Sequence, residues 1–146
     1  MKEPKPLVEI VSTGRYLPER VVTNHELERL VDTSDEWIRE RTGIRERRFV
    51  EDHETTCTMS VACGCAALDR AGLEPTDLDL ILVATSSPDH LTPPVSSQVQ
   101  YALGATGVGA MQLTVGCTGF VYALVTAHQF IATGACDNVL VIGAEL

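Results

Sequence analysis

Three observations in the sequence predict an α/β layer fold. Apolar segments with strand and helix patterns alternate along the chain, Gly and Pro separate them, and no internal repeat or low-complexity segment interrupts the order. One segment, Leu80–Ala84, is apolar at every position, which is typical of a strand covered on both faces. Such an alternation indicates helices packed on the faces of a sheet.

The first part of the chain predicts one strand and two short helices. Leu7–Thr13 reads as a strand that Gly14 and the turn after it close. Thr23 with Glu26 has the spacing of a capping box and predicts a helix that reaches Val31. Thr33 with Glu36 repeats the signature and predicts a helix through Arg41, which Gly43 ends.

The second part predicts three helices and three strands, of which the first two are expected to be buried. The small residues of Thr55–Ala71, stopped by Gly72, allow a helix to pack closely on a sheet. Thr92 can cap a helix with Pro93 at its first position. The remaining elements are, in order, a strand at Asp79–Thr85, the Thr92 helix to Leu103 with Gly104 as its stop, a strand at Ala110–Val115, a helix at Thr118–Thr133 and a strand at Asn138–Gly143.

Charge is unevenly distributed. The net charge of -9 argues against nucleic acid or an anionic membrane as a partner. From His90 to Cys136 there is no Asp, Glu, Lys or Arg, which predicts that something else covers much of this half. A membrane is excluded as the cover because Phe120–Ala132 is too short and too polar to span a bilayer. The absence of a signal-type segment and an odd number of cysteines predict a cytoplasmic protein with reduced thiols.

The sharpest local feature is the segment Val115–Phe120, where a predicted strand turns into a helix with Cys117 at the junction. Such a junction presents a side chain at the end of a sheet, where α/β proteins tend to hold ligands. The positive field of a helix N-terminus favours the thiolate, which is the nucleophile. Cys117 is therefore a candidate nucleophile, and the alternative is a small buried apolar residue.

The other cysteines and the histidines are weaker candidates. Cys63 and Cys65 lie two apart on a predicted helix and face different directions, which disfavours a tetrahedral metal site, so no metal is expected. His128 falls about three turns along the helix from Cys117, too far to act as its base. His90 lies in a predicted loop, where a histidine is most often only solvated.

Five arginines crowd into ten residues just after Trp37: Arg39, Arg41, Arg45, Arg47 and Arg48. Guanidinium groups suit phosphate oxygens and an indole face suits a purine, so the segment is a candidate nucleotide-phosphate site. The alternative is an exposed helix end whose arginines pair with neighbouring glutamates.

Set in order, these segments resemble the 3-oxoacyl-acyl-carrier-protein synthase III family, a condensing-enzyme branch of the thiolase superfamily. The resemblance covers nearly the whole chain. It is carried by the segments Gly14–Pro18, Val31–Ile38, Arg41–Arg47, Val83–Thr85 and Gly116–Phe120.

The resemblance implies a function and roles for five residues. Family members transfer an acyl group, commonly acetyl, from coenzyme A to the cysteine at the position of Cys117 and condense it with malonyl-acyl-carrier protein. No permanently bound cofactor is implied, because acyl-coenzyme A is a substrate. Trp37 would stack on the adenine, Arg41 would contact phosphates, and Thr33 would hydrogen-bond near the adenine. Thr92 stands where many members carry a phenylalanine that closes the acyl pocket, so a longer primer is expected to fit.

The resemblance also implies an architecture. Residues 1–146 would form the N-terminal half of a duplicated α-β-α-β-α, thiolase-like fold, with a mixed sheet and a buried helix that carries the nucleophile. Family members are usually homodimers, and their catalytic His and Asn come from the second half, so condensation would need that half. The alternatives are a hydroxymethylglutaryl-coenzyme A synthase-like enzyme, a secondary-metabolite ketosynthase, or a non-catalytic thiolase-like interaction module.

Overall fold

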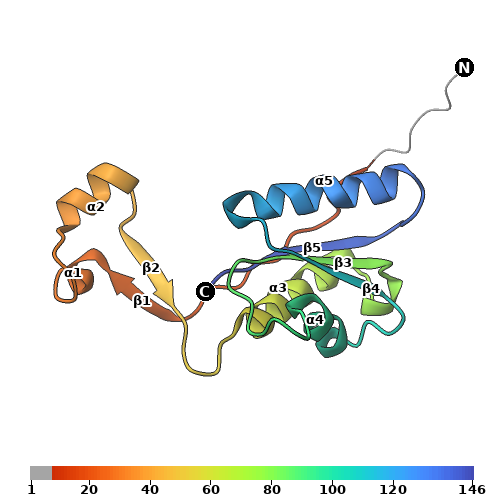
Figure 1. Ribbon diagram of the computed structural model, residues 1–146, viewed down its shortest axis with the longest axis horizontal. Coiled ribbons are helices and arrows are strands. Elements are labelled where there is room, and N and C mark those ends of the chain that lie inside the picture. Colours follow the sequence, from red (N-terminus) through yellow and green to blue (C-terminus); the bar gives the residue numbers. More distant parts are fainter. Residues whose placement is uncertain (1–7) are drawn as a thin grey trace, which may run out of the picture. The chain divides into compact units, whose positions relative to one another are not determined.

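The chain folds into two compact units. A computed structural model describes residues 8–146. Residues 8–16 together with Thr55–Leu146 form one unit, here called the sheet unit, and Leu17–Glu54 form the other, here called the ribbon unit (Figure 1).

Three parallel strands form the centre of the sheet unit. They are β3 (Leu80–Ala84), β4 (Gly109–Leu113) and β5 (Val139–Gly143), in the order β4-β3-β5. Leu80 lies opposite Gly109 on one side and Val139 on the other. The three strands predicted for the second part of the chain are therefore confirmed. A mixed sheet is expected, but these three strands are all parallel. Among the described residues, antiparallel pairing is found in the ribbon unit.

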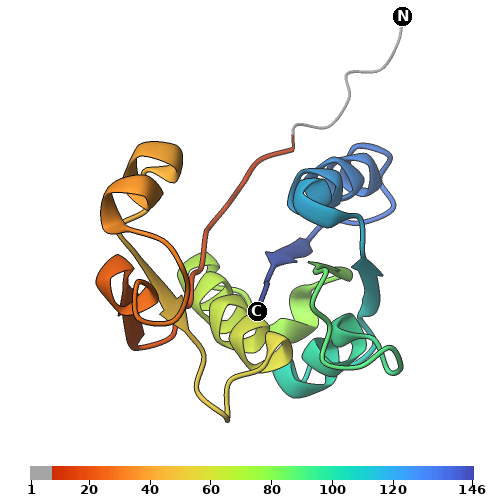
Figure 2. The ribbon, with the colours of Figure 1, turned by 60° about the vertical axis from the view of Figure 1, so that its left-hand side comes forward.

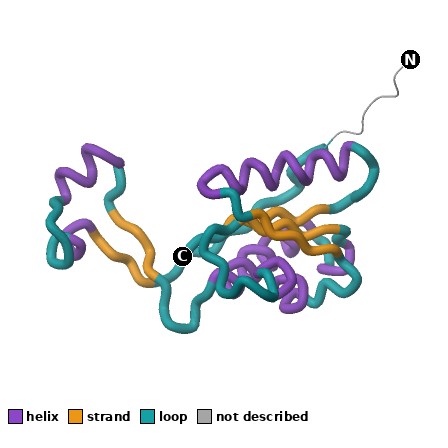
Figure 3. Tube along the Cα trace, viewed as in Figure 1, coloured by secondary structure: helices purple, strands orange, loops and turns teal. Residues whose placement is uncertain are grey.

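Helices cover both faces of this sheet. Helices α3 (Thr56–Ala71) and α4 (Val95–Leu103) lie on one face and α5 (Gly119–Ala132) on the other (Figures 1 and 3). Because successive side chains of a strand point to opposite faces, Ile81 and Val83 pack with α3 and α4, whereas Leu80 and Leu82 pack with α5. All five residues of β3 are buried, as predicted.

Within residues 8–146, helix α5 is buried on the side that faces the sheet and exposed on the other. Its buried residues are Gly119, Ala123 and Ala127, which face the sheet. The opposite face is apolar and open, with Val121 61% and Val125 54% exposed. The physical reason is that the described residues include no layer on that side of α5. Strand β4 is likewise only partly buried, because it is an edge strand.

The predicted ends of the helices are mostly correct in the sheet unit. Thr55 caps α3, and its side chain accepts a hydrogen bond from the backbone N–H of Thr58. Helix α4 begins at Val95, so the prediction that Thr92 caps it is wrong. The residue before a proline is disfavoured in helical backbone, and Pro94 therefore keeps Pro93 outside the helix. Short 3-10 turns lie at Pro75–Asp77 and Gly116–Thr118.

The predicted strand at Leu7–Thr13 does not form over residues 8–13, and Leu7 lies outside the described residues. The segment runs along α3 instead. The Ser12 hydroxyl donates to the carbonyl oxygen of Ala67 at 2.7 Å. Gly14 approaches α3 so closely that a Cβ there would lie 2.0 Å from a backbone oxygen. The backbone of this segment thus has a helix as its neighbour rather than a strand.

The ribbon unit is an antiparallel two-stranded ribbon with two short helices. Its elements are β1 (Arg20–Thr23), α1 (Asn24–Leu27), α2 (Asp35–Thr42) and β2 (Glu46–Phe49), and Figure 2 shows them from a second side. The capping box of Thr23 and Glu26 is confirmed, although α1 ends at Leu27 instead of Val31. Ser34, not Thr33, caps α2: its hydroxyl accepts from the N–H of Trp37 at 3.1 Å.

Candidate functional site

Cys117 lies in the 3-10 turn that connects β4 to α5, and its side chain is exposed. The preceding Gly116 has φ = 71°, a left-handed conformation that a side chain disfavours. The chain can therefore turn sharply from strand to helix at this point. Because β3, β4 and β5 are parallel, their carboxyl ends share one edge of the sheet, and Cys117 follows that edge. Among the described residues Cys117 is therefore not the small buried residue of the alternative interpretation.

The helix that follows Cys117 offers uncapped backbone donors. Thr118 occupies the capping position of α5, but its side chain makes no capping hydrogen bond. The N–H of Gly119 donates to the carbonyl oxygen of Gly116 in the preceding turn, whereas the N–H groups that follow it in the first turn have no partner within the helix. Together with the helix dipole they favour a negative charge at this end, such as a thiolate or the oxyanion of a tetrahedral intermediate.

The loop after β3 lies at the same sheet edge and is held by carboxylates. Glu145, which follows β5, accepts hydrogen bonds from the N–H of Ser86 at 2.9 Å and from the hydroxyl of Ser87 at 2.8 Å. Asp89 accepts from two N–H groups in the first turn of α3. This loop leads into Thr92, which is exposed. The loop that carries Thr92 is thus fixed at its start to β5 and to α3.

The remaining cysteines differ from Cys117. Burial raises the pKa of the thiols of Cys57, Cys63 and Cys136, and for Cys57 the carboxylate of Asp89 adds to this effect. A raised pKa keeps a thiol protonated and therefore poorly nucleophilic. Cys65, on α3, is the other exposed cysteine of the five. It lies inside a helix, with no strand-to-helix junction beside it.

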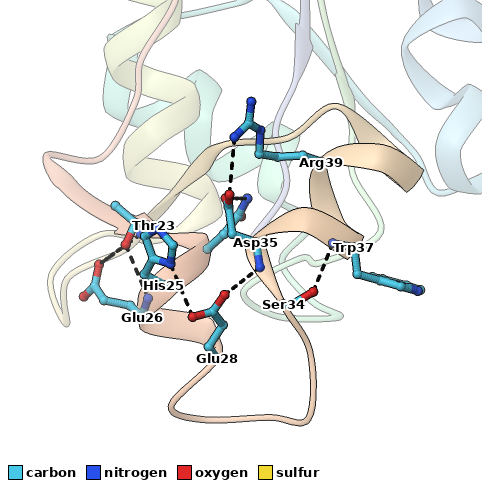
Figure 4. A network of polar contacts seen from close by, with 9 residues as sticks. Thr23, His25, Glu26, Glu28, Ser34, Asp35, Trp37 and Arg39 are labelled. Carbon is cyan, nitrogen blue, oxygen red and sulfur yellow. Dashed lines mark hydrogen bonds and ion pairs between the residues drawn. The ribbon is translucent and has the colours of Figure 1, made fainter.

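Trp37 and Arg41 lie four residues apart on α2, so they share one face of that helix. Trp37 is 56% exposed. Figure 4 shows its indole extending away from the polar contacts around Asp35. The hydroxyl of Thr33 forms no hydrogen bond among the described residues. The structure therefore leaves the three residues of the candidate nucleotide site accessible on the ribbon unit.

Three of the five arginines have partners within the ribbon unit, and two do not. Arg47 donates to the carbonyl oxygen of Val22 at 3.1 Å, and Arg48 donates to that of Pro18 at the same distance. Arg39 pairs with Asp35 at 3.4 Å. For the described residues, Arg41 and Arg45 have no hydrogen bond or ion pair. None of the described arginines pairs with Glu36, Glu40 or Glu46, although the alternative interpretation predicted this pairing. Arg41 and Arg45 therefore remain as candidate phosphate ligands.

An open groove of about 490 Å³ lies beside α2. It mixes carboxylates with guanidinium groups, and its lining contains neither Trp37 nor Arg41 (Asp35, Glu36, Arg39, Glu40, Gly43 and Arg45). Residues 8–146 contain no group of three or more potential metal ligands. No helix among them is long and apolar enough to cross a membrane.

Sequence reasoning missed two polar residues that organise the structure. Asn24, only 1% exposed, makes three side-chain hydrogen bonds in the ribbon unit. Gln112, on β4, accepts a hydrogen bond from the N–H of Val95, the first residue of α4, at 2.8 Å. Helix α4 has no side-chain cap of its own, and the double proline before it was the signal that an acceptor from elsewhere is needed.

Comparison with known proteins identifies similar sequences. A family model for 3-oxoacyl-acyl-carrier-protein synthase III matches residues 111–146, which include Cys117. Beta-ketoacyl-acyl-carrier-protein synthase III 1 of Bacillus anthracis is 52% identical over 138 residues, which are 94% of this chain and 44% of the relative.

Two solved structures have the same fold as this chain. The 3-oxoacyl-acyl-carrier-protein synthase III of Aquifex aeolicus superimposes with a TM-score of 0.91 at 49% identity, over 93% of this chain and 44% of that one. A priming beta-ketosynthase of a polyketide biosynthetic pathway superimposes with a TM-score of 0.90 at 39% identity, over 93% and 41%. The chain thus spans less than half the length of these proteins. On the agreement of sequence and fold, the chain belongs to the 3-oxoacyl-acyl-carrier-protein synthase III family, of which it covers only part.

Proposed function

We propose that this chain is the part of a condensing enzyme that receives an acyl group from acyl-coenzyme A on Cys117. The observation that carries the proposal is the exposed thiol of Cys117 in the turn between β4 and the uncapped start of α5. Both features are what an acyl-accepting nucleophile needs: access for the thioester and backbone donors near the developing oxyanion.

The first half-reaction follows from this geometry. The Cys117 thiolate attacks the carbonyl carbon of acyl-coenzyme A, a new C–S bond forms, and the C–S bond to coenzyme A breaks. The coenzyme A thiolate leaves and takes up a proton, and the acyl group remains as a thioester on Cys117. Trp37 stacks on the adenine, Arg41 contacts the phosphates, and the unpaired hydroxyl of Thr33 hydrogen-bonds near the adenine.

The second half-reaction is condensation with malonyl-acyl-carrier protein. Malonyl loses carbon dioxide, its carbanion attacks the acyl carbonyl, a carbon–carbon bond forms, and the Cys117 thiol is released. The enolate needs hydrogen-bond donors. We propose that a catalytic His and Asn in the remaining part of the enzyme supply them, and that residues 1–146 form one domain of that enzyme.

Peptide mapping after incubation of the chain with acetyl-coenzyme A tests the first half-reaction. We expect one acetyl group on Cys117 and none in the Cys117→Ala variant. The matched control is Cys65→Ala, which removes the other exposed thiol and should leave labelling unchanged. An unlabelled Cys117 in a chain that still binds coenzyme A would favour the non-catalytic interaction module instead.

Primer length depends on Thr92 in this proposal. A threonine leaves more room than a phenylalanine, so acyl groups longer than acetyl should also be transferred to Cys117. The test compares labelling by acetyl-coenzyme A and by longer acyl-coenzyme A substrates in the parent chain and in Thr92→Phe. We expect the variant to lose the longer substrates and keep acetyl. Strict acetyl preference in the parent chain would contradict this assignment.

The exposed apolar face of α5 and the uncharged segment from His90 to Cys136 support a larger assembly. Val121, Tyr122 and Val125 are each more than half exposed, and contiguous apolar surface of this kind marks interfaces. We propose that the complete enzyme is a homodimer and that it resides in the cytoplasm, where its free cysteines stay reduced. Sedimentation of the complete enzyme would show a monomer if the dimer assignment is wrong.

A further inference from the structure

Helix α2 has little apolar packing of its own. Ile38 is its one buried residue, and the ribbon unit has few other buried apolar side chains, among them Val22 at 2% exposed. A helix of eight residues is marginal without tertiary contacts. Something other than the hydrophobic effect must therefore fix its position, and with it Trp37 and Arg41.

The buried carboxamide of Asn24 holds both ends of α2. Its Nδ2 donates to Oδ1 of Asp35, the first residue of the helix, at 2.8 Å. The same nitrogen donates to the carbonyl oxygen of Ile44, just after Gly43 ends the helix, at 2.9 Å. One side chain thus bonds to the start and to the end of α2.

The other side of the carboxamide is fixed by the ribbon. Arg47, on β2, donates to Oδ1 of Asn24 at 2.7 Å and to the carbonyl oxygen of Val22, on β1, at 3.1 Å. The amide cannot be reversed, because its oxygen would then face the carboxylate of Asp35 and the carbonyl of Ile44. The network therefore specifies one orientation of Asn24 and one placement of α2 on the ribbon.

Neighbouring contacts strengthen the start of the helix. The N–H of Asp35 donates to Glu28 at 2.6 Å, and Arg39 bonds to the second oxygen of Asp35 at 3.4 Å (Figure 4). These groups lie nearer the surface, whereas Asn24 is only 1% exposed. An unpaired polar group costs most where water cannot replace its partner, so Asn24 dominates the network.

We infer that Asn24 is a positioning residue for coenzyme A binding: its buried carboxamide sets α2 and thereby orients Trp37 and Arg41 toward the nucleotide. The inference rests on the proposed role of those two residues in binding coenzyme A. Asn24 itself is buried and acts only through the helix. The sequence does not reveal this role, because it depends on groups 11, 20 and 23 residues away along the chain.

The test uses the 146-residue chain, whose single tryptophan is Trp37. Fluorescence anisotropy of Trp37 reports the order of α2, and titration with coenzyme A gives the dissociation constant. In Asn24→Ala we expect lower anisotropy and a dissociation constant raised at least about tenfold. Asp32→Ala, an exposed site in the same unit with no hydrogen bond among the described residues, should change neither.

A separate readout distinguishes positioning from general unfolding. The rate of Cys117 alkylation by iodoacetamide reports the sheet unit and should stay within about twofold in Asn24→Ala. Asn24→Asp keeps the shape but places an oxygen against Asp35, so it should weaken coenzyme A binding as well. In the double variant Asn24→Asp/Asp35→Asn, the amide at position 35 can donate to the carboxylate at position 24. This variant should recover part of the affinity for coenzyme A. Absence of such recovery would overturn the inference.

Unchanged anisotropy and coenzyme A affinity in Asn24→Ala would also overturn it. If the parent chain shows no saturable binding of coenzyme A, the proposed function fails at Trp37 and Arg41. The anisotropy of the Asn24 variants still decides whether Asn24 positions α2, so the two failures are distinguishable.

Discussion

Asp89 should be one of the largest single polar contributors to the stability of the sheet unit. Its two carboxylate oxygens accept from consecutive N–H groups in the first turn of α3, from Thr56 at 2.9 Å and from Cys57 at 2.8 Å. Thr56 is fully buried, so its N–H loses a well-placed partner in the Asp89→Ala variant. Hydrogen bonds to a charged group contribute about 1.5–3 kcal/mol each, and Asp89 is half-buried, which reduces the sum. We expect a loss of about 2–4 kcal/mol of unfolding free energy.

Urea unfolding followed by circular dichroism measures this loss. Asp89→Asn keeps one acceptor oxygen and should cost roughly half as much as Asp89→Ala. Asp137→Ala is the matched control, because the exposed Asp137 carboxylate accepts no hydrogen bond among the described residues. A change of less than about 0.5 kcal/mol in Asp89→Ala, the range of ordinary surface substitutions, would refute the reasoning.

Three further predictions concern other contacts. Gly14→Ala should lower the free energy of unfolding in urea by about 1–3 kcal/mol, because the added Cβ would lie 2.0 Å from the carbonyl oxygen of Cys63 on α3. Gly64→Ala is the control, since a Cβ there would come no closer than 3.4 Å to the side chain of Leu140. Gln112→Ala should speed amide exchange in the first turn of α4 at least about tenfold, and an unchanged rate would contradict the capping role. The fluorescence anisotropy of Trp37 should be constant around neutral pH and fall in acid. Hydrogen bonds lower the pKa of three carboxyl groups of the ribbon unit below their ordinary values: Glu26, Glu28 and Asp35. A carboxyl group whose pKa is lower in the folded state stabilises the fold at pH values above its pKa in the unfolded state. That stabilisation is lost as the pH falls through its pKa in the folded state, so an anisotropy that does not change with pH would contradict the prediction.

Elements with strong local signals were predicted well. Helix α3 carries a cap at Thr55 and a stop at Gly72, and both act within a few residues of themselves. Strand β3 is apolar at every position and therefore has to lie in the middle of the layers. Cys117 was predicted at a strand-to-helix junction, since the residues that make the turn are its immediate neighbours.

Choices between equivalent partners could not be predicted. Thr33 and Ser34 both have a hydroxyl at the start of α2, and only the backbone path decides that Ser34 is the cap. Residues 8–13 have the composition of a strand, yet their neighbour is α3. Of five arginines in one run, the two on β2, Arg47 and Arg48, bond to backbone carbonyls of the opposing strand segment.

The sequence by itself determined the α/β class and the strand-to-helix junction at which the candidate nucleophile Cys117 lies, because short-range periodicity, capping and turn chemistry depend on adjacent residues. Only the tertiary structure decided that Cys117 is exposed, that α5 keeps an open apolar face, and that Asn24 holds α2 at both ends. These properties depend on which distant groups exclude water from a side chain and pair with it, and that follows from the packed fold rather than from any local pattern.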